Sequence, residues 1–353
     1  AGAGDDIISG IIQATMANVL TTVNAGDVID GGDGNDTFKI AATGADGNAA
    51  VPINALEITN VETISVNSTG TKSTGSLTTT AANSYTITGD AKLTISNTLP
   101  QLVLAVNGAE STGGFSITLN PLAAYGSAVI GGSGNDTLNL GSAMTSLTTF
   151  AGGAGIDTLK ITDAADITPT KTAGISAVEI LGANSADTDQ FVANTLPGLV
   201  GVASYADDGD DTADTTEVVF SYLSPESANI YLYTDEDVAA TMAVDTSADV
   251  GNVFVGSAVA TADVNVVDFT GNDFETINLN ASALSPTQGH TFDNFGGSDL
   301  KTLNITGNGV TISAFNGGTK LTTIDATGAY KLTMSAANPA GALYPDTILG
   351  SAT

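Results

Sequence analysis

The chain has 353 residues, a formal net charge of −30, eight basic residues that are all lysines, and no cysteine. Contacts with phosphate require cations, so this charge argues against nucleic acid and anionic lipid as partners. The lack of cysteine excludes disulfides and thiolate metal sites. No apolar run is long enough to cross a bilayer, so no membrane insertion is expected.

One nonapeptide pattern, Gly-Gly-x-Gly-x-Asp-x-apolar-x, recurs in the first half of the chain. Three segments match it fully, at 31–38, 131–138 and 152–159. A fourth, at 1–8, has alanine in place of the first glycine. Glycine reaches backbone angles that are closed to other residues, so the first six positions can curl and direct carbonyl oxygens at one point. The last positions alternate and predict a short strand. The pattern is typical of calcium-loaded β-rolls.

The nonapeptides predict calcium sites, because Ca²⁺ takes about six to eight oxygens and a carboxylate with several carbonyls supplies part of that shell. Asp27 stands nine residues before Asp36, so two half-coils should abut there and complete a site. The candidate ligands are Asp5, Asp6, Asp27, Asp30, Gly31, Gly32, Asp33, Gly34, Asn35, Asp36, Gly131, Gly132, Gly134, Asp136, Gly152, Gly153, Gly155 and Asp157. The alternative is that these segments are turns only, since Gly, Asn and Asp dominate turns.

Strands dominate the rest of the prediction, because short runs of Thr, Val, Ile and Ala are interrupted by Gly, Asn and Asp. Helices are expected only at 11–20 and directly after Ser224. A second repeat, a strand phrase, occurs at 60–66, 177–181, 273–279, 299–305 and 320–326. Within it the interval from Phe274 to Leu300 and the interval from Leu300 to Leu321 are each the length of one solenoid coil.

We therefore expect an all-β fold of parallel β-solenoid or β-roll-like coils with few short helices. An antiparallel sandwich is the alternative, because Asn-Gly pairs are hairpin signals; they lie at 107–108, 308–309 and 316–317. The expected domains are a nonapeptide-bearing β domain at 1–185, an acidic β insertion compatible with a sandwich at 186–252, and solenoid coils at 253–353.

Carboxylates crowd the segment from 187 to 249, which contains no lysine. Within it, residues 207–211 place four aspartates around one glycine. This stretch is either a solvated acidic loop on an inserted β domain or a further calcium site. The additional candidate ligands are Asp207, Asp208, Asp210, Asp211 and, further along, Asp273.

Catalysis is not expected from this sequence. His290 is the only histidine and lies in a segment predicted to be a surface loop, so a His-Glu-x-x-His zinc site is excluded. No nucleophile elbow accompanies it. Paired carboxylates are too numerous in such an acidic chain to indicate a glycosidase.

The nonapeptides, the recurrent Val-Glu-Thr-Ile strands and the acidic, cysteine-free composition together resemble the bacterial surface-layer (S-layer) proteins of the repeats-in-toxin (RTX) kind, as in Caulobacter. The resemblance implies a protein exported by type I secretion that folds and forms a lattice on the cell surface when calcium binds. It also implies carboxylate ligands at Asp27, Asp36, Asp136 and Asp157, with carbonyls from 31–35, 131–135 and 152–156. The nonapeptides are isolated rather than in tandem, so a long regular β-roll is not expected, and no lipopolysaccharide-anchoring domain is identified.

The expected function is that of a secreted, calcium-dependent structural protein that self-assembles into a surface layer. Its expected partners are other copies of itself and cell-surface polysaccharide or lipopolysaccharide. A calcium-dependent adhesin or extracellular filament subunit that binds glycan or matrix is the alternative. A third hypothesis is the C-terminal half of a calcium-dependent hydrolase or lyase. Since the chain begins and ends within the pattern, we expect a processed form or part of a longer protein.

Overall fold

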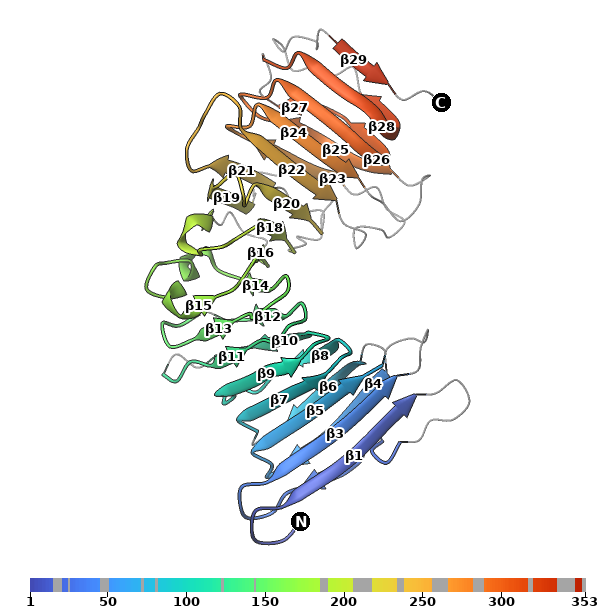
Figure 1. The fold of residues 1–353 in the computed structure, drawn as a ribbon, viewed down its shortest axis with the longest axis vertical. Coiled ribbons are helices and arrows are strands. Elements are labelled where there is room, and N and C mark those ends of the chain that lie inside the picture. Colours follow the sequence, from blue (N-terminus) through green and yellow to red (C-terminus); the bar gives the residue numbers. More distant parts are fainter. Residues whose placement is uncertain are drawn as a thin grey trace. The chain divides into compact units, whose positions relative to one another are not determined.

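The computed structural model describes residues 1–14, 21–24, 26–44, 51–70, 73–79, 82–121, 124–142, 144–184, 190–205, 218–233, 238–255, 266–281, 289–316, 320–334 and 347–350. Nearly all of these residues lie in strands or tight turns, and every strand pairing among them is parallel. The prediction of an all-β parallel solenoid is confirmed (Figure 1).

The chain divides into two compact units. Unit 1 comprises Ala1–Thr162, Thr168–Glu179 and Leu196–Gly198, and unit 2 comprises Asp163–Ile167, Ile180–Thr195 and Leu199–Thr353. Three short 3₁₀ segments are the helical elements of the described part, namely η1 (Ala164–Asp166), η2 (Thr172–Gly174) and η3 (Ala193–Thr195).

Unit 1 contains two parallel sheets whose strands alternate along the chain. The first sheet is β1 (Ile7–Ala14), β3 (Thr37–Gly44), β5 (Thr63–Thr69), β7 (Ser84–Gly89), β9 (Ala105–Ser111), β11 (Ala128–Ile130), β13 (Thr149–Ala151) and β15 (Ile175–Ser176). The second is β2 (Val28–Asp30), β4 (Val51–Thr59), β6 (Ser73–Thr79), β8 (Leu93–Thr98), β10 (Phe115–Leu119), β12 (Thr137–Leu140) and β14 (Thr158–Ile161).

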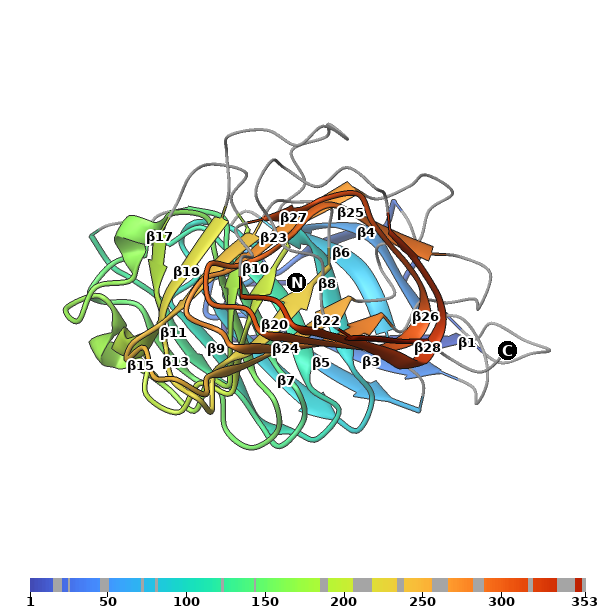
Figure 2. The same ribbon diagram turned by 90° about the horizontal axis from the view of Figure 1, so that it is seen from above.

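Unit 2 repeats this arrangement, and Figure 2 shows its two sets of strands on opposite sides of the coils. One set is β16 (Ile180–Ala183), β18 (Gly201–Ser204), β20 (Asn229–Leu232), β22 (Val250–Val255), β24 (Thr276–Ala281), β26 (Thr302–Ile312), β28 (Thr323–Met334) and β29 (Thr347–Gly350). The other is β17 (Gln190–Val192), β19 (Val218–Leu223), β21 (Val238–Met242), β23 (Val266–Gly271), β25 (Gly289–Gly296) and β27 (Phe315–Asn316). The second half of β26 also pairs with β25, so this strand turns the corner of its coil.

The core is built from columns of apolar side chains, one from each coil. In unit 1 a column of buried residues runs through Phe38, Ile64, Tyr85, Val106, Val129, Phe150 and Ile175, which are register partners in successive strands. Strands such as β24 alternate buried and partly exposed residues, as the period of two requires. Each coil therefore buries its apolar side chains against its neighbours.

The coil lengths predicted from the strand phrase are confirmed. Thr276 pairs with Thr302, and Thr302 pairs with Thr323. These partners are separated along the chain by the same two intervals that separate Phe274, Leu300 and Leu321. The phrase marks the same position in each coil, because its threonine begins β5, β24, β26 and β28.

Several local predictions are wrong. Residues 11–14 of the predicted helix belong to β1, and 15–20 lie outside the described residues. Two of the predicted Asn-Gly hairpins lie inside continuous strands, β9 and β26, so the sandwich alternative is wrong. The described strands of 186–252 are also parallel. Parallel pairing overrides the local turn preference, because each coil templates the extended backbone of the next.

A ladder of asparagines runs along unit 2 across β20, β22, β24 and β26. Asn252 Nδ2 donates to Asn229 Oδ1 (3.0 Å), Asn278 Nδ2 donates to Asn252 Oδ1 (2.8 Å), and Asn304 Nδ2 donates to Asn278 Oδ1 (2.8 Å). In-register parallel strands make such stacking possible, since identical side chains lie one strand spacing apart. In β28 the next register position is Asp325, whose carboxylate has no amide N–H to continue the ladder.

We expect Asn278→Ala to lower the free energy of unfolding by about 1–2 kcal/mol, because it removes two of these hydrogen bonds. Asn304→Ala, which removes one of them, is the matched control and should cost less. Urea unfolding followed by circular dichroism measures both variants. Equal losses for the two variants would contradict a ladder that contributes to stability.

Candidate metal sites at the coil corners

Acidic residues stand at the corners of several coils, directly before the first residue of a strand. We call them the corner carboxylates; they are Asp36, Glu62, Asp136, Asp157, Glu179, Asp249 and Glu275. Asp36, Asp136 and Asp157 are the aspartates of the three complete nonapeptides, and all three are fully buried. A buried carboxylate is costly unless hydrogen-bond donors or a cation compensate its charge.

Six of the seven corner carboxylates accept a hydrogen bond from a backbone N–H group of the preceding coil, and the seventh, Asp249, accepts from Thr246 N of its own loop. The first pair is Asp6 N to Asp36 Oδ1 (2.7 Å) and Asp36 N to Glu62 Oε2 (2.7 Å). The same relation recurs in the later coils, where Phe115 N donates to Asp136 Oδ1 (2.8 Å), Asp136 N to Asp157 Oδ1 (2.7 Å), Asp157 N to Glu179 Oε2 (2.8 Å) and Asp249 N to Glu275 Oε2 (2.8 Å). These charge-assisted bonds join one coil to the next.

The second oxygens of the three nonapeptide aspartates differ in their partners. Asp136 Oδ2 accepts a hydrogen bond from Gly132 N at 2.8 Å, which closes its own loop. Asp36 Oδ2 and Asp157 Oδ2 are buried and have no hydrogen-bond partner among the described residues. Two orphaned carboxylate oxygens in the interior require an explanation, because each costs the full desolvation of a charged group.

A backbone carbonyl approaches each orphaned oxygen at the first glycine of its nonapeptide. A Cβ built on Gly31 would overlap the carbonyl oxygen of Asn60 and lie 2.5 Å from Asp36 Oδ2. A Cβ on Gly152 would overlap the carbonyl oxygen of Ala177 and lie 2.5 Å from Asp157 Oδ2. Only glycine therefore allows the carbonyl of the next coil to come this close.

The later glycines of the nonapeptides supply the curl. Gly32 (φ 97°), Gly34 (φ 139°), Gly153 (φ 105°) and Gly155 (φ 121°) occupy the region that favours glycine. The loops stack on those of the neighbouring coil, with Asp33 N donating to Gly2 O (3.1 Å) and Ala154 N to Gly132 O (2.9 Å). The curled conformation inferred from the glycine spacing is therefore found at 31–38 and 152–159, whereas Gly132 and Gly134 of the middle nonapeptide do not have this left-handed φ.

Electrostatics at Asp157 favour neutralisation of its charge. Burial, together with the charges of Asp136 and Glu179, raises the pKa of Asp157 to about 6 against the opposing effect of the hydrogen bond from the Asp136 N–H. Burial also raises the pKa of Asp136, opposed by the N–H groups of Gly132 and Phe115 and by the charge of Lys92. A proton or a cation at these corners would relieve the repulsion.

The other predicted ligands of the first corner have protein partners of their own. Asp5 Oδ1 accepts from Asn35 N (2.9 Å) and Asp6 Oδ2 accepts from Gly2 N (3.0 Å). Asp30 Oδ1 accepts from Gly32 N (3.2 Å) and from Asn60 Nδ2 (2.8 Å). Asp33 is exposed, and its backbone forms an isolated parallel β-bridge with Ala3.

Asp27 does not stand at the same corner as Asp36. It precedes β2 in the second sheet of unit 1, whereas Asp36 precedes β3 in the first. Its Oδ2 accepts a hydrogen bond from Asn24 N at 2.7 Å. The spacing of nine residues therefore carries the chain from one sheet to the other.

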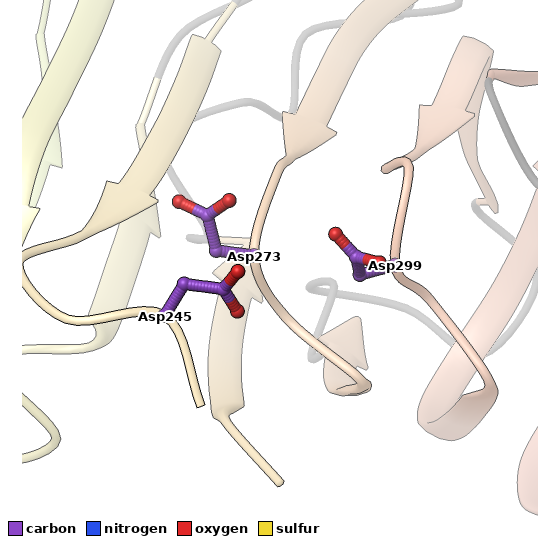
Figure 3. Close-up of side chains that lie close together, drawn as sticks. All are labelled: Asp245, Asp273 and Asp299. Carbon is purple, nitrogen blue, oxygen red and sulfur yellow. The ribbon is translucent and has the colours of Figure 1, made fainter. Parts of the chain in front are cut away.

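A second group of carboxylates lies in unit 2, where one ligand oxygen each from Asp245, Asp273 and Asp299 lie within 4.8 Å of one another (Figure 3). Burial and the neighbouring carboxylates raise the pKa of Asp273, against a hydrogen bond from the Met242 N–H. Lys320 forms an ion pair with Asp299 and compensates part of this charge. Of the predicted ligands in this part of the chain, Asp207, Asp208, Asp210 and Asp211 lie outside the described residues.

Sequence reasoning found the nonapeptide aspartates but missed the residues of the following coil. In the sequence Glu62 and Glu179 belong to the strand phrase, and no motif marks Asp245 or Asp299 as a ligand. A signal was present, because Glu62 follows Asp36 by about one coil length along the chain, and Glu179 follows Asp157 in the same way. That spacing brings the second repeat next to the first.

The residues at Asp36 and Asp157 fit a hard divalent cation. The possible metal ligands at each of these corners are a carboxylate oxygen and a backbone carbonyl oxygen, which are ligand types that Ca²⁺ and Mg²⁺ take. Histidine and cysteine, which softer metals prefer, are absent from these corners.

His290 is not in a surface loop, contrary to the prediction. It lies in β25 and is 5% exposed, and burial lowers its pKa.

No helix in the described part of the chain is long and apolar enough to span a bilayer. No protein-family model matches the sequence, and no curated protein matches it significantly.

The raised pKa of Asp157 predicts a pH dependence of stability in chelator. The folded state favours the protonated carboxyl, so this contribution is complete below pH 3.8, the ordinary pKa, and is lost as pH rises through about 6. We expect the melting temperature of the wild type to rise from pH 7.5 to 5.0 by a few degrees more than that of Asp157→Asn. Identical pH profiles for the two proteins, measured by calorimetry in EGTA, would contradict the shift.

Proposed function

We propose that this chain is a calcium-dependent structural protein that self-assembles into an extracellular surface layer. The observation that carries the proposal is the pair of buried carboxylate oxygens, Asp36 Oδ2 and Asp157 Oδ2, that have no donor among the described residues. The net charge of −30 adds to the need for a cation, because the compact state concentrates these charges.

Calcium fits the proposal better than magnesium or a transition metal. The nonapeptide loops are irregular, and Ca²⁺ accepts irregular oxygen shells whereas Mg²⁺ demands nearly octahedral geometry. Extracellular modules of modest affinity are filled at millimolar calcium and are empty at cytoplasmic levels. The unneutralised carboxylates then keep the chain unfolded before export and make folding dependent on the ion outside.

Self-assembly is supported by a nearly uncharged stretch of unit 1. Between Lys92 and Asp157 the only charged residues are Glu110 and the buried Asp136. Two copies could approach through these coils with little Coulomb repulsion despite their overall charge.

Exposed apolar side chains lie on the same coils. Each stands one to three residues before β9, β11 or β13, which are adjacent strands, and they are Leu102 (53% exposed), Leu104 (45%), Tyr125 (65%) and Leu147 (54%). We call these four residues the apolar ridge. Contiguous exposed apolar groups are typical of protein–protein contacts.

The alternative is a calcium-dependent adhesin or filament subunit that binds glycan or matrix, such as cell-surface polysaccharide or lipopolysaccharide. It is favoured by uncharged polar and aromatic side chains on one face of unit 2. Tyr231 and Phe254, two residues after the ladder residues Asn229 and Asn252, stack with ring centroids 5.0 Å apart. Neighbouring amides and aromatic rings are suited to a neutral carbohydrate.

Calcium removal tests the proposal on the full chain. We expect circular dichroism and small-angle scattering to report an expanded state in EGTA and a compact β-structure in millimolar calcium. Negative-stain micrographs should show sheets only in calcium. Unchanged spectra and scattering between the two conditions would refute calcium-dependent folding, and saturable glycan binding by a monomer that forms no sheets would favour the adhesin.

A charge on the apolar ridge should block assembly without blocking folding. We expect Tyr125→Glu and Leu147→Glu to retain the calcium-induced circular dichroism change but to form few or no sheets, because each places an ion in the proposed contact. Val244→Glu is the matched control, since Val244 is 69% exposed and lies in unit 2. Normal sheets from both ridge variants would exclude the ridge as an interface.

A further inference from the structure

Two of the three complete nonapeptides differ from the third in what the following coil presents to them. We infer that Asp36 and Asp157 each hold a divalent cation together with a backbone carbonyl of the next coil, from Asn60 and Ala177, whereas Asp136 holds none. This inference rests on the proposed calcium dependence. It assigns the second half of each site to the strand phrase, at 60–66 and 177–181, rather than to another nonapeptide.

The two proposed sites share a second-coil turn of one design. Asn60 and Ala177 both have φ of 50°, in the left-handed region that residues with a Cβ seldom occupy. Each is followed by a buried valine, Val61 or Val178, and then by the glutamate that accepts the backbone N–H of Asp36 or Asp157. The nonapeptide and this turn therefore meet twice, in separate parts of unit 1.

The left-handed residue is significant because alanine pays for this conformation without a local reward. The left-handed region is sterically strained for an L-residue, and asparagine tolerates it better than alanine does. At Ala177 this strained residue carries the carbonyl that reaches Gly152 and Asp157 Oδ2. The strained turn places this carbonyl beside the orphaned oxygen, and it is the orphaned oxygen that calls for a ligand.

When the carboxylate is ionised, neither of the two facing oxygens at a site carries a proton. A carbonyl oxygen and a carboxylate oxygen repel one another, and neither Asp36 Oδ2 nor Asp157 Oδ2 has a donor within the described chain. A divalent cation between them converts this repulsion into attraction. It also ties one coil to the next at the point where the backbone turns.

The middle nonapeptide shows what happens when donors are present. Asp136 Oδ1 accepts from Phe115 N and Asp136 Oδ2 accepts from Gly132 N, so both oxygens are satisfied by the chain itself. The following coil carries another nonapeptide here, and the carbonyl at the first glycine comes from Gly152, which has no left-handed φ. This corner needs no ion.

A corner of unit 2 gives an independent comparison. Asp273 is left-handed (φ 71°) and precedes buried Phe274 and then Glu275, as in the second-coil turn of the two proposed sites. There Asp249 accepts from Thr246 N and Thr246 Oγ1, and the Lys301 ammonium lies 3.6 Å from Glu275 Oε1. A hydroxyl and a lysine occupy the roles that a bound cation would have in unit 1.

Isosteric amides test the assignment, because an asparagine Nδ2 can donate to the facing carbonyl while removing the charge. The variants are Asp36→Asn, Asp157→Asn and, as the matched control, Asp136→Asn, all in the full chain. Equilibrium dialysis against millimolar calcium, with metal analysis, counts the ions bound per chain, and calorimetry gives melting temperatures in calcium and in EGTA.

We expect Asp36→Asn and Asp157→Asn each to lose one bound ion per chain and part of the calcium-induced rise in melting temperature, with no loss of melting temperature in EGTA. Asp136→Asn should bind as many ions as the wild type and melt lower in both buffers, because an amide replaces an acceptor of two hydrogen bonds. Suppose that the wild type binds calcium. The inference, but not the proposed function, would be overturned if Asp136→Asn bound fewer ions than the wild type, or if Asp36→Asn and Asp157→Asn bound as many.

A wild type that binds no calcium would overturn both the inference and the proposed function. Terbium-soaked crystals of the wild type provide a measurement that no variant's folding can affect. Anomalous peaks beside Asp36 and Asp157 and none beside Asp136 are the expected result. A peak beside Asp136, or no peak beside the other two, would contradict it.

Discussion

The burial of carboxylates at the coil corners is the constraint on which the rest of unit 1 depends. A parallel solenoid exposes backbone N–H groups wherever the chain turns from one sheet to the next, and these groups need acceptors. The corner carboxylates supply them, with Asp36, Glu62, Asp157 and Glu179 each accepting an N–H from the preceding coil. The chain thus satisfies its backbone with charged acceptors and must then compensate that charge.

The compensation takes different forms at corners of the same design. At Asp136 a second backbone N–H completes the carboxylate, and at Asp249 a threonine does so while a lysine faces the neighbouring glutamate. At Asp36 and Asp157 the chain provides no such donor to one oxygen. A protein with eight lysines and 38 acidic residues has few cations to place in its interior. Our proposal assigns that role to calcium, which makes the ion concentration part of the folding equilibrium.

Surface charge and coil stacking act together in the proposed assembly. Each coil gains its stability from its neighbours, so an ion that joins two coils supports those on either side of it. The coils from β9 to β13 carry little charge and several exposed apolar side chains, which makes them the part of unit 1 best suited to contact a second copy. Folding and association would then depend on the same ion for different reasons: the first needs it inside the corners, and the second needs a folded surface.

Much of the fold followed from local chemistry. Glycine spacing identified the curled loops, and the intervals between Phe274, Leu300 and Leu321 matched the coil lengths found in unit 2. Local signals failed where the neighbouring coil decided the backbone. Asn-Gly pairs lie inside β9 and β26, and His290 is buried in β25, because parallel pairing extends segments that would form turns alone.

The sequence by itself determined that the chain is acidic, free of cysteine and rich in glycine turns and strand segments that repeat at coil-length intervals, since these properties depend on residue type and on spacing along the chain. The choice between a parallel solenoid and an antiparallel sandwich needed the tertiary structure. Only the tertiary structure decided which carboxylate oxygens have donors. Asp36, Asp136 and Asp157 occupy the same position of one motif. The second oxygen of Asp136 has a donor in its own loop, whereas those of Asp36 and Asp157 have none among the described residues. The carbonyl that faces each of them comes from a segment a full coil away. Hydrogen bonds between coils depend on register and backbone direction, which no single stretch of sequence contains.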